Sequence, residues 1–209
     1  MKLLEIPFYK NDENGVQCLQ VCMKSILKYL LDKDFSLEEL DSLTYRKENY
    51  WTWTHQILKP LHELGLHVTY YSKGDLQDVL RGEEFIKEEF KEHAQTILQH
   101  TDIEAVVRSA KEALKLNLCQ KQETTLKQLE EYLLQKYAVF VLVDANVLYQ
   151  RNNTNFQGHF IMLTGFDEEN IYYHESGPNN PKPNSKVSKE IFEQAFSALG
   201  TDRDCVVVK

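Results

Sequence analysis

The sequence predicts an α+β protein in which helices come first and an antiparallel sheet follows. Residues 18–31 carry apolar side chains at helical spacing, with lysines left for the solvent. Residues 75–136 are rich in Lys, Glu, Gln and Leu, contain one glycine and no proline, and show the helical period in several blocks. From residue 137 onward, apolar runs alternate with polar turns, which is typical of a sheet of short strands.

Local signals predict the elements of the first third of the chain. The helix over 18–31 begins directly after a turn that contains Gly15. The stretch SLEEL (36–40) has a capping-box pattern, in which Ser36 is the N-cap and Glu39 follows three residues later. The other elements expected here are a helix over 53–64, interrupted or bent near Pro60, and a strand over 65–71 (GLHVTYY).

The rest of the chain is expected to form a helical insertion and then the sheet. Residues 75–136 are the insertion, inside a single domain that covers residues 1–209. The stretch SGPNNPKPNS (176–185) is expected to be a loop, because its prolines and asparagines suit turns. The strands are expected at 137–145, 159–167, 170–176 and 204–209, with a helix at 188–199.

Composition limits the classes of partner. The net charge of -8 argues against nucleic acid or an anionic membrane surface, because both attract clustered Lys and Arg. No apolar run approaches the ~20 residues of a membrane helix. Four cysteines are too few for a disulfide framework, and the first residues lack the pattern of a signal peptide. We therefore expect a cytoplasmic protein, in the host's cytoplasm if a bacterium delivers it without a cleavable signal. The oligomeric state is left open.

The first helix carries two thiols with different expected roles. A helix N-terminus favours a thiolate, because its unpaired N–H groups and its dipole attract negative charge. Cys18 lies at that end of the helix. Cys22 lies one turn further in, on the same face as Leu19 and Ile26, where it is expected to be a small core residue. The pattern therefore indicates Cys18 as the candidate nucleophile.

A nucleophilic thiol needs a base, and the base needs a group that orients its ring. His159 opens a strand after a polar loop, and Glu175 ends the next strand. A hairpin with its turn at 167–170 would bring the two side chains together. His174 points to the other face by strand alternation and is expected outside the triad, although a register shift of one residue would make it the base.

Three stretches carry a resemblance to a known family. They are IPFYKNDENGVQCLQVCMKSILKYL (6–30), GHFIMLTGFDEENIYYHESGP (158–178) and VSKEIFEQAF (187–196). They resemble the cysteine, histidine and acid segments of the C39-like peptidases, the bacteriocin-leader peptidases and their papain-like relatives. The resemblance implies a papain-like cysteine protease fold, with an N-terminal helical lobe and a C-terminal antiparallel sheet. It also implies that Cys18 is the nucleophile, His159 the base and Glu175 the orienting acid.

The sequence departs from the family pattern at three places. Asn11 stands where the family usually has the glutamine of the oxyanion hole, and its amide is a shorter but competent donor. Leu19 follows the cysteine where the family commonly has glycine. The acid segment reads Glu175-Ser176 where the family has aspartate followed by proline.

The sequence thus predicts a thiol-dependent hydrolase that cleaves a peptide or isopeptide-like amide through an acyl-enzyme on Cys18, without a metal or other cofactor. The expected partner is a peptide or protein substrate. An acyl transferase or deamidase with the same triad is one alternative, and a non-catalytic papain-fold binding module is another. A zinc site built from Cys18 and Cys22 with His55 or His159 is disfavoured, because no second paired motif exists. A guanylyl-cyclase-like family of similar fold ranks last, because no Gly-rich phosphate loop is seen.

Overall fold

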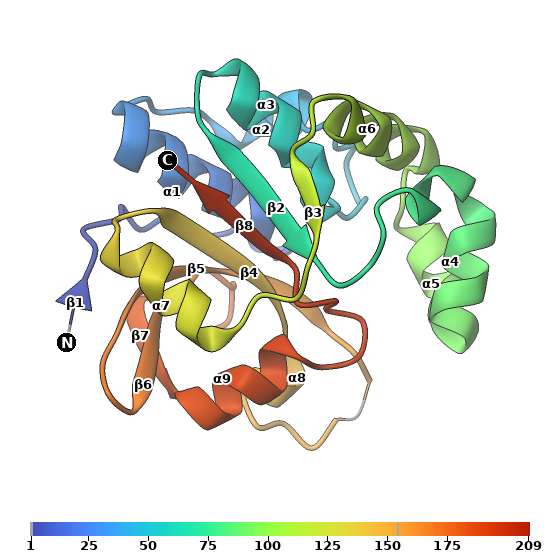
Figure 1. Ribbon diagram of the computed structural model, residues 1–209. Coiled ribbons are helices and arrows are strands. Elements are labelled where there is room, and N and C mark those ends of the chain that lie inside the picture. Colours follow the sequence, from blue (N-terminus) through green and yellow to red (C-terminus); the bar gives the residue numbers. More distant parts are fainter. Residues whose placement is uncertain (1, 154) are drawn as a thin grey trace.

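A sheet of eight strands forms the centre of the molecule in the computed structural model, which describes residues 2–153 and 155–209 (Figure 1). Seven strands lie in the order β3-β2-β8-β4-β5-β6-β7, and β1 pairs with β5. All pairs are antiparallel except β2 with β3. The strands are β1 (Lys2–Leu3), β2 (Val68–Ser72), β3 (Cys119–Lys121), β4 (Ala138–Asp144), β5 (Gly158–Phe166), β6 (Asn170–Glu175), β7 (Lys182–Ser188) and β8 (Cys205–Val208).

Helices cover both faces of this sheet. Successive residues of a strand point to opposite faces, so Phe140 of β4 enters one apolar core while its neighbours Val139 and Val141 enter the other. The first core also holds side chains of α1 (Cys18–Leu31), α2 (Leu37–Leu43), η1 (Thr54–Ile57), α3 (Leu58–Glu63) and α6 (Ile103–Lys115). The second holds side chains of α7 (Leu126–Leu134), α8 (Ala145–Leu148) and α9 (Lys189–Phe196).

The structure confirms the α+β fold class and most of the expected elements. Ser36 and Glu39 make both bonds of the capping box at the start of α2. The expected helix over 53–64 is the 3₁₀ turn η1 followed directly by α3, with Pro60 in the first turn of α3, where its missing N–H costs nothing.

The expectation that residues 176–185 form only a loop was wrong. Its second half belongs to β7, which pairs with β6 from Lys182 onward. Pro183 is tolerated there because β7 is the last strand of the sheet, and an edge strand leaves one row of N–H groups without a ladder partner. The pairing is irregular between Tyr173 and Glu175, which is typical of such an edge.

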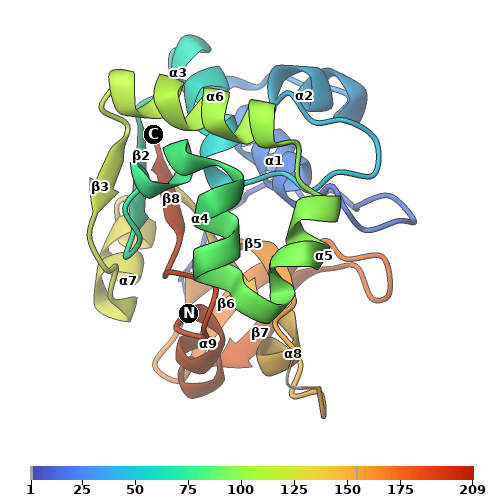
Figure 2. The same cartoon turned by 90° about the vertical axis from the view of Figure 1, so that its right-hand side faces the viewer.

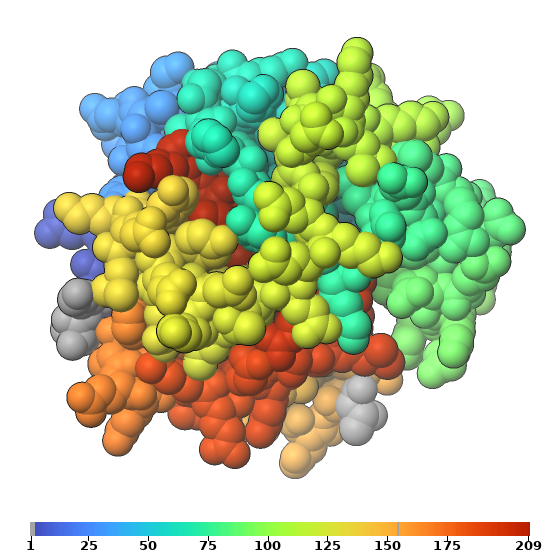
Figure 3. Space-filling view, viewed as in Figure 1, coloured from blue at the N-terminus to red at the C-terminus, as the bar shows by residue number. Residues whose placement is uncertain are grey.

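The middle segment, 75–136, contains more than helices. Cys119–Lys121 form β3, which extends the sheet parallel to β2, and α7 packs against β4 and β5. Four short helices of this segment lie along one side of the molecule (Figures 2 and 3). They are η2 (Asp78–Arg81), α4 (Glu83–Phe90), η3 (Lys91–His93) and α5 (Ala94–Gln99). That 75–136 is an insertion within one domain stays a prediction.

Candidate active site

A polar turn lies directly before α1 and leads into its first residue. The Asp12 carboxylate accepts the N–H of Gly15 at 2.8 Å, and Gly15 has a φ of +70°, in the left-handed region that favours glycine. A side chain at Gly15 would also meet the ring of Pro178 at 3.0 Å. Gln17 follows as the N-cap residue, with its side-chain amide bonded to Asp41 at 2.8 Å. The turn therefore places Cys18 at the first position of the helix, against the segment after β6.

Cys18 is partly exposed, and its surroundings favour the thiolate. Burial alone would raise the pKa of the thiol. The hydrogen bond and charge of His159, together with the N–H groups of Phe160 and Leu19, outweigh burial, so the pKa of Cys18 is lowered. The side chain of Cys22, one turn further along α1, lies in the first core, where burial holds its pKa well above the usual value.

His159 and Glu175 form the second contact of the site. The Nε2 atom of His159 lies 3.1 Å from Oε1 of Glu175, and both side chains are about nine-tenths buried. Burial alone would lower the pKa of His159, but the interactions with Cys18 and Glu175 raise it. The lowered thiol pKa and the raised imidazole pKa have the same cause, because each charged form stabilises the other. The two pKa shifts therefore favour the charged form of each partner.

The hairpin of β5 and β6 explains why Glu175, and not His174, meets His159. His174 pairs with Met162 across the two strands, so it shares a face with that residue. Glu175 falls on the opposite face, together with Ile161 and His159. His174 is held elsewhere, with Nε2 2.8 Å from the carbonyl of Ile6 and Nδ1 accepting the N–H of Asn184 at 3.3 Å.

Asn11 carries an unpaired side-chain donor in the turn that leads to Cys18. The side-chain oxygen Oδ1 of Asn11 accepts the N–H of Gln17 at 3.2 Å and the N–H of Asp12 at 2.9 Å. These two bonds fix which way the side-chain amide points. Its backbone N–H donates to Ser176 O at 2.9 Å. The Nδ2 atom is buried and has no hydrogen-bond partner among the described residues. A buried unpaired donor is costly, so this atom calls for a functional explanation.

Leu19, the residue directly after the cysteine, points into the core. Its side chain is 1% exposed and belongs to the first core, so it lies inside the molecule. A side chain at Gly177 would meet Oε1 of Glu175 at 2.8 Å, so a substitution there would displace this carboxylate. The N–H of Gly177 donates to the same oxygen at 2.7 Å.

Sequence reasoning missed Tyr149, whose hydroxyl donates to Oε2 of Glu175. Tyr149 caps the C-terminal end of α8 and lies 26 residues before the acid that it contacts. No local pattern links the two positions, since only the packing of α8 beside the sheet brings them together.

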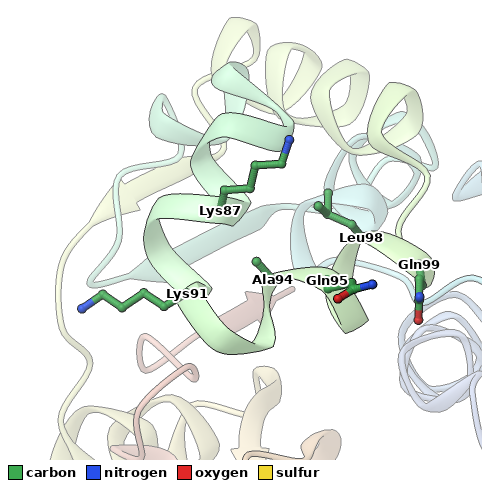
Figure 4. Close-up of a pocket in the computed structure, with 6 residues that line it drawn as sticks. All are labelled: Lys87, Lys91, Ala94, Gln95, Leu98 and Gln99. Carbon is green, nitrogen blue, oxygen red and sulfur yellow. The ribbon is translucent and has the colours of Figure 1, made fainter.

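The described residues form surface hollows outside the cluster of Cys18, His159 and Glu175. A polar one of about 230 Å³ borders the turn before Cys18 and is lined by residues that include Gln17, Asp41 and Arg46. A larger one of about 560 Å³ lies on α4 and α5, between side chains that include Lys87 and Leu98 (Figure 4).

The described residues contain no group of three His, Cys, Asp or Glu side chains that could hold a metal ion. His55, one candidate ligand, is buried with Nε2 3.0 Å from the carbonyl of Val106. Burial lowers its pKa to about 4. No helix within residues 2–153 and 155–209 combines the length and the apolar character that crossing a bilayer requires.

The fold and this cluster define a papain-like α+β protein with a cysteine, a histidine and a glutamate in contact. A family model described as guanylylate cyclase matches residues 9–208, and the chain belongs to that family. The sequence-based ranking of a guanylyl-cyclase-like family as last was therefore wrong. No curated protein matches the chain significantly.

Solved structures of C39-like peptidases resemble the fold. A double glycine motif protease from an AMS/PCAT transporter, in complex with the leader peptide, is 15% identical with a TM-score of 0.52, over 100% of this chain and 94% of that one. The peptidase domain of Streptococcus ComA, a bi-functional ABC transporter, is 12% identical with a TM-score of 0.48, over 100% and 96%. A C39-like peptidase from Bacillus anthracis is 20% identical with a TM-score of 0.35, over 50% and 57%. The first likeness confirms the C39-like fold expected from the sequence.

Proposed function

We propose that this protein is a thiol hydrolase that cleaves a peptide or isopeptide-like amide through an acyl-enzyme on Cys18. The observation that carries the proposal is that His159 lies 3.1 Å from Glu175 and interacts with Cys18 strongly enough to lower the pKa of the thiol despite burial. The peptidase-like fold supports it, and the leader peptide in one structural neighbour supports a peptide as the substrate class.

The reaction follows from the charges of the pair. The Cys18 thiolate attacks the amide carbon, and the carbonyl oxygen becomes an oxyanion. His159 then gives its proton to the leaving amine as the C–N bond breaks, which leaves a thioester and a neutral imidazole. Water attacks the thioester while His159 takes one of its protons, and the carboxylic acid leaves as the thiolate is restored. Glu175 stabilises the imidazolium and holds its ring.

Asn11 supplies the oxyanion contact in this proposal. Its buried Nδ2 has no hydrogen-bond partner among the described residues. Its side-chain oxygen accepts a backbone N–H of the residue directly before Cys18. The Cys18 N–H, at the first position of α1, has no acceptor among the described residues and is the second donor. Such donors act on charge that develops during the reaction and cost no reorganisation.

The test is amide turnover in a library of peptides and isopeptides, followed by amine release and by the mass of the acyl-enzyme. Cys18→Ala should abolish both signals. Asn11→Ala should lower turnover by ~10²- to 10³-fold and leave Cys18 alkylation almost unchanged. Asn14→Ala, an exposed change in the same turn, is the matched control and should leave turnover intact. The products separate the alternatives: peptide hydrolysis releases a substituted amine and a carboxylic acid, acyl transfer gives a new amide, and deamidation, in which water is also the acceptor, releases ammonia.

The family description favours a second candidate, the cyclisation of GTP. Incubation with GTP and Mg²⁺, with nucleotides separated by chromatography, tests it on the same preparations. Cyclic nucleotide that forms equally in Cys18→Ala, together with no amide turnover in the wild type, would overturn the hydrolase proposal.

A further inference from the structure

Both oxygens of the Glu175 carboxylate are held by fixed donors. Oε1 receives the His159 ring at 3.1 Å and the Gly177 N–H at 2.7 Å, and Oε2 receives the Tyr149 hydroxyl. The Glu175 side chain is 8% exposed. Because a glutamate has a further torsion beyond that of an aspartate, its carboxylate must be fixed at both oxygens to present one of them steadily to an imidazole.

The sequence around Tyr149 is built to hold that hydroxyl in place. Asp144 caps α8 by accepting the N–H of Asn146 at 2.8 Å, and its Oδ1 also lies 3.4 Å from the N–H of Gln157. The Arg151 guanidinium lies 4.7 Å from the centre of the Tyr149 ring and bonds to Gln157 at 3.0 Å. The tyrosine is thus fixed by the helix on one side and by a cation on its face.

Tyr149 acts as a donor and not as a charge. Burial and the charge of Glu175 raise the pKa of its hydroxyl far above the usual value, so the proton stays on the oxygen at any working pH. The neutral Tyr149 hydroxyl donates to Oε2 and leaves Oε1 to face the imidazole ring. A cation in place of this hydroxyl would compete with the imidazolium for the carboxylate.

We propose that Tyr149 is a positioning residue for the thiol chemistry, which fixes the Glu175 carboxylate so that one oxygen faces His159. The inference rests on the proposed function for its effect on turnover, but not for its effect on the imidazole. If the carboxylate turns away once its donor is lost, the imidazolium loses a partner and becomes easier to deprotonate.

The test compares Tyr149→Phe with Tyr173→Phe. The control residue is a buried tyrosine of β6, and its hydroxyl is not among the donors found for Glu175. The readouts are the imidazole pKa of His159 from NMR, the pH profile of Cys18 alkylation by iodoacetamide, and turnover. Tyr149→Phe should lower the His159 pKa, slow alkylation at mildly acidic pH, and reduce kcat by ~10- to 100-fold with little change in KM. Tyr173→Phe should change none of these.

A double mutant shows whether Tyr149 works through Glu175. In a Glu175→Gln background, Tyr149→Phe should cause no further fall in the His159 pKa. An unchanged or raised His159 pKa in the single variant would overturn the inference, as would an equal fall in the double mutant. The two proposals fail separately. A lowered His159 pKa in a protein without amide turnover leaves the positioning role and removes the hydrolase. Normal amide turnover of the Tyr149→Phe variant with an unchanged His159 pKa would leave the hydrolase and remove the positioning role.

Discussion

At the scale of single residues, two cysteines one helical turn apart differ in everything that sets thiol reactivity. Cys18 meets an imidazole and two N–H groups, whereas Cys22 meets the apolar core. Burial also raises the pKa of Cys119 to about 12 and that of Cys205 further still. Among the four cysteines, Cys18 at the start of α1 is the one whose thiol pKa is lowered.

Alkylation should separate these thiols. At about pH 6, iodoacetamide should modify Cys18 well before the other three cysteines, because only its thiolate is stabilised there. Mass spectrometry of digests after short exposure measures the order. The His159→Ala variant is the control and should bring Cys18 close to the rate of an ordinary thiol. Equal labelling of all four cysteines in the wild type would contradict an activated site.

The sequence could predict the residues whose type alone indicates chemistry. Cys18 was found because it opens a helix, and Glu175 because strand alternation places it on the face of His159 while His174 takes the other. Tyr149 could not be found in this way. An aromatic residue after a short helix has no pattern that distinguishes it from packing, and its partner is fixed only by the tertiary fold.

At the scale of elements, the same limit explains the strands that sequence reasoning missed. Prolines hide the sequence pattern that would indicate a strand at β7. This segment is a strand because it pairs with β6, and not because its own apolar and polar residues alternate. The strand at Cys119–Lys121 is three residues long and mostly exposed, so it has no periodicity to detect. Long amphipathic elements such as α1 and α6 need no such context, because their own spacing defines the buried face.

The cap of α8 links an element to the proposed chemistry. Asp144→Ala removes the side chain that accepts the Asn146 N–H and should lower the free energy of unfolding by about 1 kcal/mol. It should also reduce turnover, because α8 carries Tyr149. Asp144→Asn keeps an acceptor and should restore most of both. Urea unfolding and amide turnover measure the two effects.

Ser36→Ala is the matched control, because it removes the cap of α2, which contributes no residue to the proposed triad. It should cost a similar free energy of unfolding and leave turnover unchanged. An equal loss of turnover in both variants would mean that stability alone, and not the placement of α8, explains the effect.

At the scale of the whole molecule, one buried carboxylate ties the helical lobe to the sheet. Asp204 accepts the Thr54 hydroxyl of η1 at 2.5 Å and the Tyr70 hydroxyl of β2 at 2.7 Å. Burial, together with a smaller contribution from the nearby Asp202 charge, raises its pKa to about 6, although the hydroxyls of Thr54, Tyr70 and Ser72 oppose the rise. The charged form is therefore less favourable in the folded protein than in the unfolded chain.

That shift makes the stability of the fold depend on pH in a definite direction. The pKa of Asp204 lies above its unfolded value of about 3.9, so the folded state binds the proton more tightly. Its stabilisation is complete below about pH 4 and is lost as the pH rises through about 6, and the loss reaches roughly 3 kcal/mol. Other carboxylates and histidines titrate in the same range, so the wild type alone cannot isolate this contribution.

Asp204→Asn isolates it, because an amide stays neutral at every pH while it keeps the size of the side chain. The two hydroxyls can each turn to donate or accept, so the variant should fold. Urea unfolding at intervals between pH 4 and pH 7 gives both free energies. The variant's stability should gain on that of the wild type as the pH rises, with most of the change between about pH 4 and 6. Two curves that stay parallel across this range would show that Asp204 is not the carboxylate that costs the folded protein its stability at neutral pH.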